Sequence, residues 1–245
     1  MKFTIYQDSR RGTRTTNQDR IAYCYSQSAL FMAVADGMGG YPRGELAAEI
    51  AVQFMAAAFL REAVPCLADP IQFLRTVIRD AHHAICSQSK SGQLAITPRT
   101  TCVVCIVQNG VAYWAHVGDS RLYHLRSGEI VYRTRDHSQV QRLVDTGQLR
   151  EEAVPSHPER NRIYSCLGGD ELPRISLSYG VRLQEHDLLL LCSDGLWSPV
   201  SNQLIASALA TPALDLCLPE LMDLAQMRAG KAADNLSAVA MRWQR

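Results

Sequence analysis

The sequence predicts an α+β fold in which antiparallel sheets are covered by pairs of helices. Two observations support this fold class: the order of the predicted elements, and hairpin signals between β-rich runs. The predicted order is strands, two helices, a run of strands, two helices and one strand, which differs from the alternation expected of a parallel α/β sheet. Apolar residues make up 47% of the chain and charged residues 20%, which is typical of a globular protein.

The first half of the chain is predicted to contain three strands and two long helices. Partial alternation and one continuous apolar run predict strands at residues 2–7, 20–25 and 30–35. Residues 42–63 are rich in Ala, Glu, Leu and Met, which predicts a helix. Pro42 is compatible with this helix, because Pro is tolerated at a helix start. Asp69 followed by Pro70 is a start signal for a second helix, which ends at about Ser89.

The second half is predicted to begin with two hairpins. Asn109-Gly110 separates two β-rich runs, which is a strong hairpin signal, and Ser127-Gly128 separates two others. The four runs lie at residues 100–107, 111–117, 121–125 and 129–133. Later patterns predict strands at residues 174–179, 187–192 and 236–243, and helices at residues 202–210 and 213–228.

Residues 136–171 differ from the rest of the chain because they are polar and contain few apolar anchors. We interpret this segment as an irregular surface insertion with short helical pieces, and expect it to be the most mobile part. Since no repeat and no Pro/Gly/Ser-rich linker interrupts the 245 residues, we expect a single domain over residues 1–245.

Charge and hydropathy exclude several classes of protein. The formal net charge is +1, so no bulk field favours nucleic acid or an anionic membrane. No run approaches the ~20 apolar residues of a membrane span, and the N-terminus lacks the apolar stretch of a signal peptide. We therefore expect a cytoplasmic monomer with no membrane or nucleic-acid partner.

The eight cysteines are spread through apolar runs and indicate reduced thiols in the core. Cys102 and Cys105 form the one C-x-x-C pair. Residues three apart on a strand point to opposite faces, so we favour core packing over a zinc or redox site for this pair.

Five aspartates in short polar contexts are the candidate functional residues. Three of them follow apolar, strand-like runs, where a carboxylate is costly unless it is paired or binds a cation. A single such Asp is more often a turn former or a helix cap, whereas several strand ends that converge would form an anionic pocket for hard divalent ions. The contexts are Arg14-Thr15-Thr16-Asn17-Gln18-Asp19, Asp36-Gly37-Met38-Gly39-Gly40, Gly118-Asp119-Ser120-Arg121, Ser193-Asp194-Gly195-Leu196-Trp197 and Asp234-Asn235-Leu236-Ser237.

These five motifs, in this order, resemble those of the metal-dependent protein phosphatases of the type 2C (PPM) family, and of its compact bacterial members in particular. The resemblance covers essentially the whole chain, and five motifs in the family order are far more specific than any one of them. It implies a β-sandwich of two antiparallel sheets flanked by pairs of helices. It also implies a serine/threonine protein phosphatase that uses Mn²⁺ or Mg²⁺.

The resemblance assigns a metal-binding role to particular residues. Asp36 is expected to bridge two metal ions, and the backbone carbonyl of Gly37 to complete one coordination sphere. Asp194 and Asp234 are expected to bind the first ion, and Asp19 the second, either directly or through water. Oxygen ligands of this kind suit Mg²⁺ or Mn²⁺ better than zinc.

Further roles follow from the same resemblance. Asp119 is similar to the residue that, with Asp194, holds a third and weaker ion in bacterial members, so a third ion is an open alternative to two. Arg14 corresponds to the arginine that grips the substrate phosphate, and a guanidinium offers phosphate a bidentate, permanently charged fork. Residues 136–171 correspond to the family's flap.

Three residues depart from the family pattern. Gln18 stands where many relatives have Glu, which changes the charge beside the metal site. Met38 stands where eukaryotic members often have a histidine proposed as the general acid, so the acid is either a metal-bound water or an unidentified residue. Arg99 precedes Thr100 where relatives often have glycine.

The sequence therefore predicts that phosphoserine and phosphothreonine are hydrolysed by direct attack of a water that bridges two metal ions, without a phosphoenzyme. The expected partner is a phosphorylated protein, the substrate of a bacterial Ser/Thr kinase that this enzyme opposes. Two alternatives stay open: a non-catalytic regulator on the same fold that binds phosphoproteins, and a phosphatase of small phosphoesters.

Overall fold

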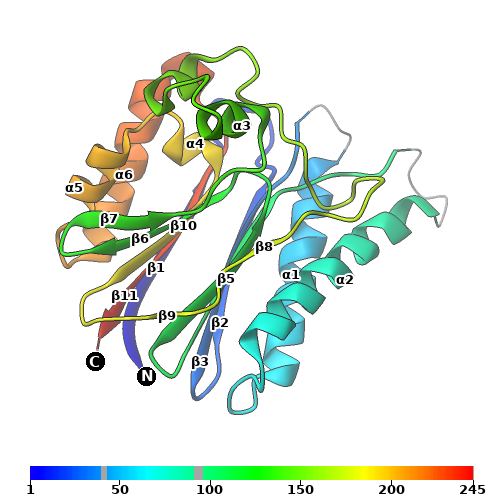
Figure 1. Cartoon of the computed structure of the whole chain (residues 1–245), viewed down its shortest axis with the longest axis vertical. Helices are drawn as coiled ribbons and strands as arrows, with labels where there is room; N and C mark the ends of the chain where they lie inside the picture. Colours follow the sequence, from blue (N-terminus) through cyan, green and yellow to red (C-terminus); the bar gives the residue numbers. More distant parts are fainter. Residues whose placement is uncertain (40–42, 91–95, 245) are drawn as a thin grey trace.

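The computed structural model describes residues 1–39, 43–90 and 96–244. It is a β-sandwich of two antiparallel sheets with helices on both outer faces (Figure 1), so the predicted α+β class is confirmed. The predicted helix start at residue 42 and Gly40 of the second motif lie outside the described residues.

One sheet contains both ends of the chain, and the other contains the first predicted hairpin. The first sheet has the order β1 (Lys2–Arg10), β11 (Leu236–Gln244), β10 (Leu188–Cys192), β6 (Arg121–Arg126) and β7 (Glu129–Arg133). The second has the order β2 (Asp19–Tyr25), β3 (Ala29–Asp36), β4 (Cys102–Gln108), β5 (Val111–Val117) and β8 (Ser176–Leu177), and β9 (Val181–Arg182) also pairs with β5.

The space between the sheets is filled by one apolar layer. Alternate residues of the central strands meet there, among them Met32, Val34, Leu189, Leu191 and Val239, all fully buried. The intervening residues of the same strands face the helices, which explains why β3, β4 and β10 are apolar throughout rather than alternating.

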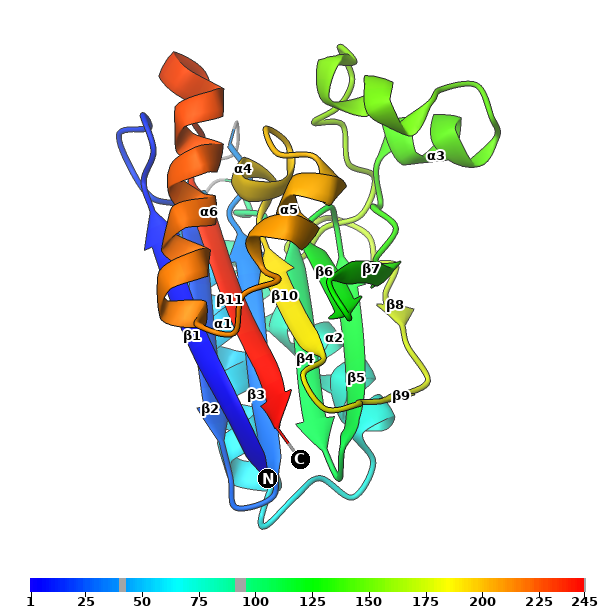
Figure 2. The ribbon, with the colours of Figure 1, turned by 90° about the vertical axis from the view of Figure 1, so that its left-hand side faces the viewer.

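Each sheet is covered by helices on its outer face (Figure 2). The helices α1 (Gly44–Glu62) and α2 (Pro70–Lys90) pack on the second sheet, where Phe31 and Phe59 have ring centroids 5.5 Å apart. The helices α4 (Asp194–Trp197), α5 (Asn202–Ala208) and α6 (Leu214–Ala229) pack on the first sheet. Alanines at 47, 48 and 51 bring α1 close to its sheet, because small side chains allow a short approach.

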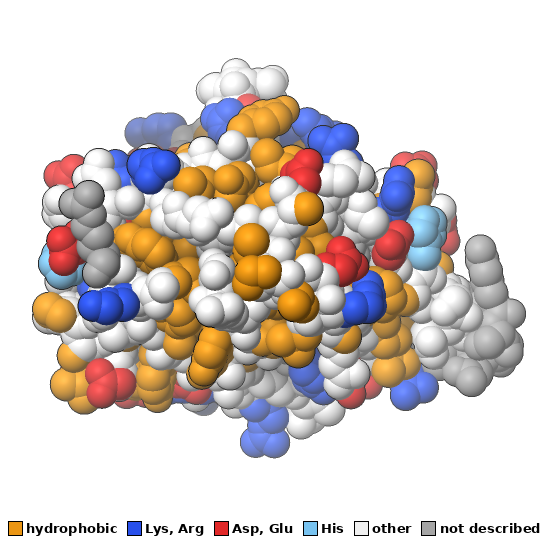
Figure 3. Space-filling model, turned by 90° about the horizontal axis from the view of Figure 1, so that it is seen from below, with side chains coloured by type: hydrophobic (Ala, Val, Ile, Leu, Met, Phe, Trp, Pro, Cys, Tyr) orange, Lys and Arg blue, Asp and Glu red, His pale blue; other side chains and the backbone are white. Residues whose placement is uncertain are grey.

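The 136–171 segment stands over one end of the sandwich, and the two termini lie at the other end (Figures 1 and 2). It contains α3 (Gln139–Asp145) and the 3₁₀ turn η1 (Glu151–Ser156), and a second 3₁₀ turn, η2 (Gly230–Ala232), follows α6. Figure 3 shows the end with the termini, where apolar side chains reach the surface in the middle and charged ones lie mostly around them. The candidate aspartates are at the opposite end, under the 136–171 segment.

The structure corrects three predicted elements. The predicted strand at 174–179 shrinks to Ser176–Leu177, and the unpredicted β9 follows it, because Gly180 (φ +95°) turns the edge away and packs on Tyr113. Strand β10 begins after Asp187, whose carboxylate binds Arg126 (2.7 and 2.9 Å). The short helix α4 was not predicted, because four residues give too little periodicity to detect.

All eight cysteines are free thiols. Cys102 lies in the core beneath α1 and α2, and Cys105 lies in the layer between the sheets. The prediction that this C-x-x-C pair packs on opposite faces is confirmed. Among the helices of the described residues, none combines the length and the apolar character that crossing a membrane requires.

Candidate metal centre

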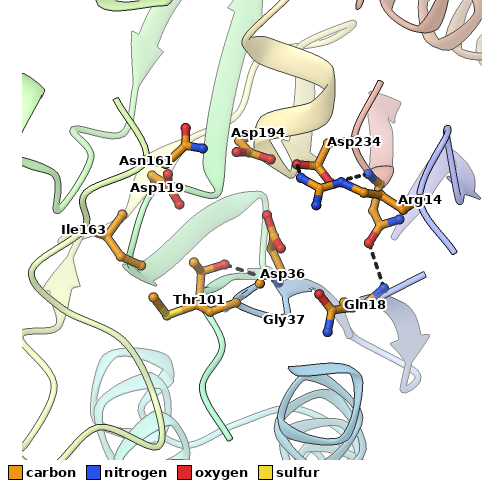
Figure 4. Close-up of a pocket in the computed structure, with 13 residues that line it drawn as sticks. Arg14, Gln18, Asp36, Gly37, Thr101, Asp119, Asn161, Ile163, Asp194 and Asp234 are labelled. Carbon is orange, nitrogen blue, oxygen red and sulfur yellow. Dashed lines mark hydrogen bonds and ion pairs between the residues drawn. The ribbon is translucent and has the colours of Figure 1, made fainter. Parts of the chain in front are cut away.

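Four of the five candidate aspartates line one cavity of about 240 Å³ at the covered end of the sandwich. Figure 4 shows Asp36, Asp119, Asp194 and Asp234 approaching it from different elements. We call this cavity the carboxylate pocket. Its lining residues are Arg14, Gln18, Asp36, Gly37, Met38, Gly39, Thr101, Asp119, Asn161, Ile163, Asp194, Asp234 and Asn235.

Strand pairing explains why residues so distant in the sequence meet. Asp36 ends β3 and pairs directly with Asp19, the first residue of β2. Asp119 follows β5, Asp194 follows β10, and Asp234 precedes β11. The two sheets place all these strand ends at the same end of the sandwich, so the carboxylates are brought together by the packing of the sheets and by no local motif.

The Asp36 turn is held by the two threonines that precede β4. The backbone N–H of Asp36 donates to Thr101 Oγ1 (3.2 Å), and its carbonyl accepts from Thr100 Oγ1 (2.8 Å) and from the N–H of Thr101 (2.9 Å). A Cβ on Gly37 would lie 2.4 Å from the backbone of Gly44, so only glycine fits there. The turn therefore presents the Asp36 carboxylate from a rigid backbone.

Asp19 lies beside the pocket and is only 2% exposed. Its Oδ2 accepts a hydrogen bond from Ser193 (2.7 Å), whereas its Oδ1 is buried and has no hydrogen-bond partner among the described residues. A buried carboxylate oxygen without a partner is rare and costly. A cation near Asp36 and Asp19 would remove that cost.

The electrostatics of the pocket oppose ionisation of these carboxyl groups. Burial raises the pKa of Asp19 to about 6 and that of Asp194 to about 7. It raises the pKa of Asp36 and of Asp119 well above the usual range, and the charge of Asp194 adds to both effects. Divalent cations would reverse this balance, and a set of oxygen donors fits Mg²⁺ or Mn²⁺.

The carboxylates line a common cavity, but they do not converge on a single point. In residues 1–39, 43–90 and 96–244, no group of three or more Asp, Glu, His or Cys side chains is gathered closely enough to hold an ion as it stands. Like charges repel at short range, so the bound ions themselves would have to draw these side chains together. The ligand roles of the five aspartates and of Gly37 stay predictions.

Arg14 reaches the same pocket, where its Nη2 donates to Asp234 Oδ2 (2.6 Å; Figure 4). The side chain is 55% exposed, and the structure gives it no other ion pair among the described residues. The guanidinium is thus already beside the carboxylates, with most of its donors available to a phosphate. Its phosphate-binding role also stays a prediction.

A buried network holds the Asp119 turn. Arg121 donates two hydrogen bonds to Asp136 (2.7 and 2.9 Å) and one to Tyr123 (3.1 Å), and its guanidinium lies 3.4 Å from the ring centroid of Trp197. Trp197 in turn donates from Nε1 to the carbonyl of Asp119 (3.0 Å). Arg121 thereby joins the first residue of the 136–171 segment to α4, the helix that begins at Asp194.

His137 fixes the same turn from the other side. Its Nδ1 accepts from the backbone N–H of Gly118 (3.2 Å), its Nε2 pairs with Ser176 (2.9 Å), and its ring stacks on His116 at 4.6 Å. Burial lowers the pKa of His137 to about 3, which keeps the ring neutral. Since both ring nitrogens are engaged, the arrangement favours a structural role for His137.

Several residues in and beside the pocket were missed by sequence reasoning. Thr101 binds the Asp36 turn, Ser193 binds Asp19, and Asn161 and Ile163 enter the pocket from the 136–171 segment. Asn235 was detectable as the neighbour of Asp234 in its motif, and its amide joins Gln18, Arg11 and Thr16. No sequence signal distinguishes Asn161 or Ile163 from other residues of an irregular segment.

Comparisons with known proteins agree with this geometry. The sequence pattern of the family described as Protein phosphatase 2C matches residues 6–228. Serine/threonine protein phosphatase PstP of Mycobacterium tuberculosis is 34% identical over 232 residues, which cover 94% of this chain and 43% of that protein. The chain thus spans less than half the length of these mycobacterial relatives.

Solved structures show the same fold. Serine/threonine phosphatase Stp1 from Staphylococcus aureus superposes with a TM-score of 0.91 at 30% identity, over 100% of this chain and 96% of that one. The catalytic domain of PstP in complex with two manganese ions superposes with a TM-score of 0.82 at 29% identity, over 99% of both chains.

The Arg121 network yields a stability prediction. Arg121→Ala should lower the free energy of unfolding by about 3–5 kcal/mol, because it leaves the buried Asp136 carboxylate unpaired. Arg135→Ala is the matched control, since Arg135 pairs with Asp145 while 71% exposed, and it should cost less than about 1 kcal/mol. Urea unfolding of both variants checks this. Equal losses would show that Arg121 does not organise the turn.

The raised carboxyl pKa values predict how the metal-free protein responds to pH. The pKa of Asp194 is about 7 when folded and close to 3.9 when unfolded, so the folded state holds more protons between these values and loses stability as pH rises through them. Asp194→Asn removes this penalty. In EDTA it should raise the free energy of unfolding by about 1–3 kcal/mol at pH 7.5 and by much less at pH 5.

Urea unfolding at the two pH values measures this difference, with the exposed Asp215→Asn as control. Comparing each variant with wild type cancels the opposite slope from His82, His116 and His137, whose pKa values are lowered by burial. If Asp194→Asn destabilised the metal-free protein equally at both pH values, the carboxylate would not be strained as described.

Proposed function

This chain belongs to the protein phosphatase 2C family, and from that premise we propose that it is a metal-dependent serine/threonine protein phosphatase. The observation that supports this most directly is the convergence of Arg14 with Asp36, Asp119, Asp194 and Asp234 on one cavity. A permanent cation beside a cluster of carboxylates suits the joint binding of divalent ions and a phosphate.

We propose that Asp36, the Gly37 carbonyl, Asp194 and Asp234 hold one ion, that Asp36 and Asp19 hold a second, and that Asp119 with Asp194 offers a weaker third position. Bound Mn²⁺ or Mg²⁺ would neutralise the carboxylates and activate the water that attacks phosphorus. The fit rests on the donor set and on the unpartnered Oδ1 of Asp19.

The residues of the chain bind and orient the substrate. Arg14 would turn from Asp234 to the phosphate, which is favourable once Asp234 is neutralised by another cation. Thr101 offers no free nucleophile, because its hydroxyl pairs with Ser120 (2.7 Å) and accepts from Asp36. Attack by water without a phosphoenzyme is therefore the simplest course. Met38 cannot donate a proton, so we propose that solvent in the open cavity protonates the leaving alcohol.

We propose a phosphorylated protein as substrate, on a serine or threonine, with a bacterial Ser/Thr kinase as the enzyme that adds the phosphate. The named relatives support this, since PstP and Stp1 are both serine/threonine phosphatases. We further propose that residues 136–171 act as a flap over the pocket, because Asn161 and Ile163 line it, and that the chain works as a cytoplasmic monomer.

The proposal predicts hydrolysis that depends on metal. The chain should hydrolyse p-nitrophenyl phosphate and a phosphothreonine peptide with Mn²⁺, and EDTA should abolish both. Asp36→Asn should lower kcat/KM by at least about 100-fold, because it removes the charge shared by two ions. Asp215→Asn, on the exposed side of α6, is the control and should retain full activity.

The outcomes separate the competing functions. Activity that survives chelation or Asp36→Asn contradicts the metal mechanism. Phosphopeptide binding without hydrolysis under any divalent ion would support the non-catalytic regulator. A much higher kcat/KM for metabolite phosphoesters than for phosphopeptides would support the small-substrate alternative.

Arg14 allows a second test of the site. Arg14→Lys keeps the charge but loses the bidentate fork, so kcat/KM for p-nitrophenyl phosphate should fall by about 10-fold, equivalent to roughly 1.4 kcal/mol. Arg11→Lys, three residues earlier and exposed, should change it little. Steady-state kinetics at saturating Mn²⁺ measure kcat/KM of both variants. Equal effects of the two substitutions would contradict a phosphate-binding role for Arg14.

A further inference from the structure

We propose that a second cavity, next to the carboxylate pocket, binds acidic residues of the phosphoprotein substrate. This inference rests on the proposed function and adds the class of sequence that the enzyme prefers. The cavity has a volume of about 460 Å³, and we call it the arginine groove. Its lining residues are Arg99, Arg142, Tyr164, Ser165, Cys166, Gly169, Asp170, Glu171, Leu172, Pro173 and Arg174.

The groove shares its walls with the carboxylate pocket. Ile163 lines the pocket, whereas the next residue, Tyr164, lines the groove. The two cavities also meet at a second place, where Met38 lines the pocket and its backbone N–H donates to the carbonyl of Arg99 (2.9 Å), a groove residue. A peptide with its phosphorylated residue in the pocket therefore has flanking residues within reach of the groove, since each extended residue spans about 3.3 Å.

The groove offers positive charge that the protein does not itself neutralise. Arg142 and Arg174 are exposed, and neither forms an ion pair with another described residue. The Arg142 guanidinium lies 3.8 Å from the ring centroid of Tyr164, an arrangement that leaves its edge free for a carboxylate. Two such charges that line one cavity favour an acidic ligand.

Arg99 adds a third guanidinium. It pairs with Asp170 (3.0 Å), whose side chain is 89% exposed, so a substrate carboxylate can exchange with Asp170 at little cost. Glu171 is also exposed. The net charge of the groove is nevertheless positive, because its three arginines outnumber Asp170 and Glu171. This position is one of the departures from the family pattern, and an acid-binding role gives a physical account of an arginine there.

The groove is held in shape by backbone contacts. Ser165 Oγ accepts from the N–H of Arg174 (2.9 Å), which fixes the backbone of Arg174 beside Ser165. The N–H of Tyr164 donates to the carbonyl of His137 (2.8 Å), which fixes Tyr164 close to the start of α3, the helix that contains Arg142. The arginines therefore project from a defined frame, so binding requires little ordering of the backbone.

The test uses phosphothreonine peptides in which a single Glu occupies successive positions on either side of the phosphothreonine, with Ala elsewhere. At one or two neighbouring positions, Glu should raise kcat/KM about threefold to tenfold over the all-Ala peptide, and added salt should reduce the gain. The quantity compared is the ratio of kcat/KM for the Glu and Ala peptides. A ratio near one at every position overturns the proposal.

Variants locate the effect. Arg142→Glu combined with Arg174→Glu should reverse the ratio and favour a peptide with Lys at the same position. Arg75→Glu combined with Arg79→Glu, on the exposed face of α2, is the matched control and should leave the ratio as in wild type. A ratio that stays unchanged in the groove variant, or falls equally in the control, overturns the assignment to this groove.

A binding measurement separates this proposal from the proposed activity. Fluorescence anisotropy with the Asp36→Asn variant of the 245-residue chain should show tighter binding of the Glu peptide than of the Ala peptide, whether or not wild type hydrolyses either one. Absence of hydrolysis with this preference intact would contradict the phosphatase activity alone. Equal affinities for the two peptides would contradict the groove alone.

Discussion

The mutual repulsion of buried carboxylates is the constraint on which the rest of this structure depends. Asp19, Asp36, Asp119 and Asp194 all sit where burial disfavours their charge, and no fold would place them together to gain stability. The fold tolerates this cost because burial of the large apolar layer between the two sheets stabilises the folded protein. A site that is costly when empty is one that binds cations strongly, since the ions remove the repulsion when they bind.

Hydrogen bonds around the carboxylates hold the turns that carry them, so the carboxylates cannot move apart to reduce their repulsion. Thr101 fixes the Asp36 turn, and Arg121 with Trp197 fixes the Asp119 turn. His137 joins the same turn to the 136–171 segment. Because one network supports both the carboxylates and the start of this segment, contacts made on the segment have a direct physical connection to the carboxylates of the pocket.

Elements with strong local sequence signals were predicted more accurately than elements whose position depends on packing. Strand β5 was predicted to the residue, because it is rich in apolar residues and bounded by Asn109-Gly110 and Gly118, whereas the predicted bounds of β3, β4 and β10 differ from the observed ones by one or two residues. The edge at residues 174–182 was not predicted correctly, because its pairing depends on Gly180 packing against β5. The aspartates were found from their motifs. Asn161 and Ile163 come from an irregular segment whose path only its neighbours define, and the arginine groove combines part of that segment with Arg99 and Arg174.

The sequence by itself determined the class of fold and the candidate acidic residues of the site. Both depend on short stretches of sequence: hydrophobic periodicity predicts strands and helices, and five brief acidic motifs predict hard-metal chemistry. Only the tertiary structure decided which of these acids share a cavity, that Asp19 lies beside it with an unpartnered oxygen, and that three arginines from distant positions line a second cavity next to it. The reason is that distances between residues far apart in the chain are set by how the two sheets and their covering segments pack, and no local pattern encodes that packing.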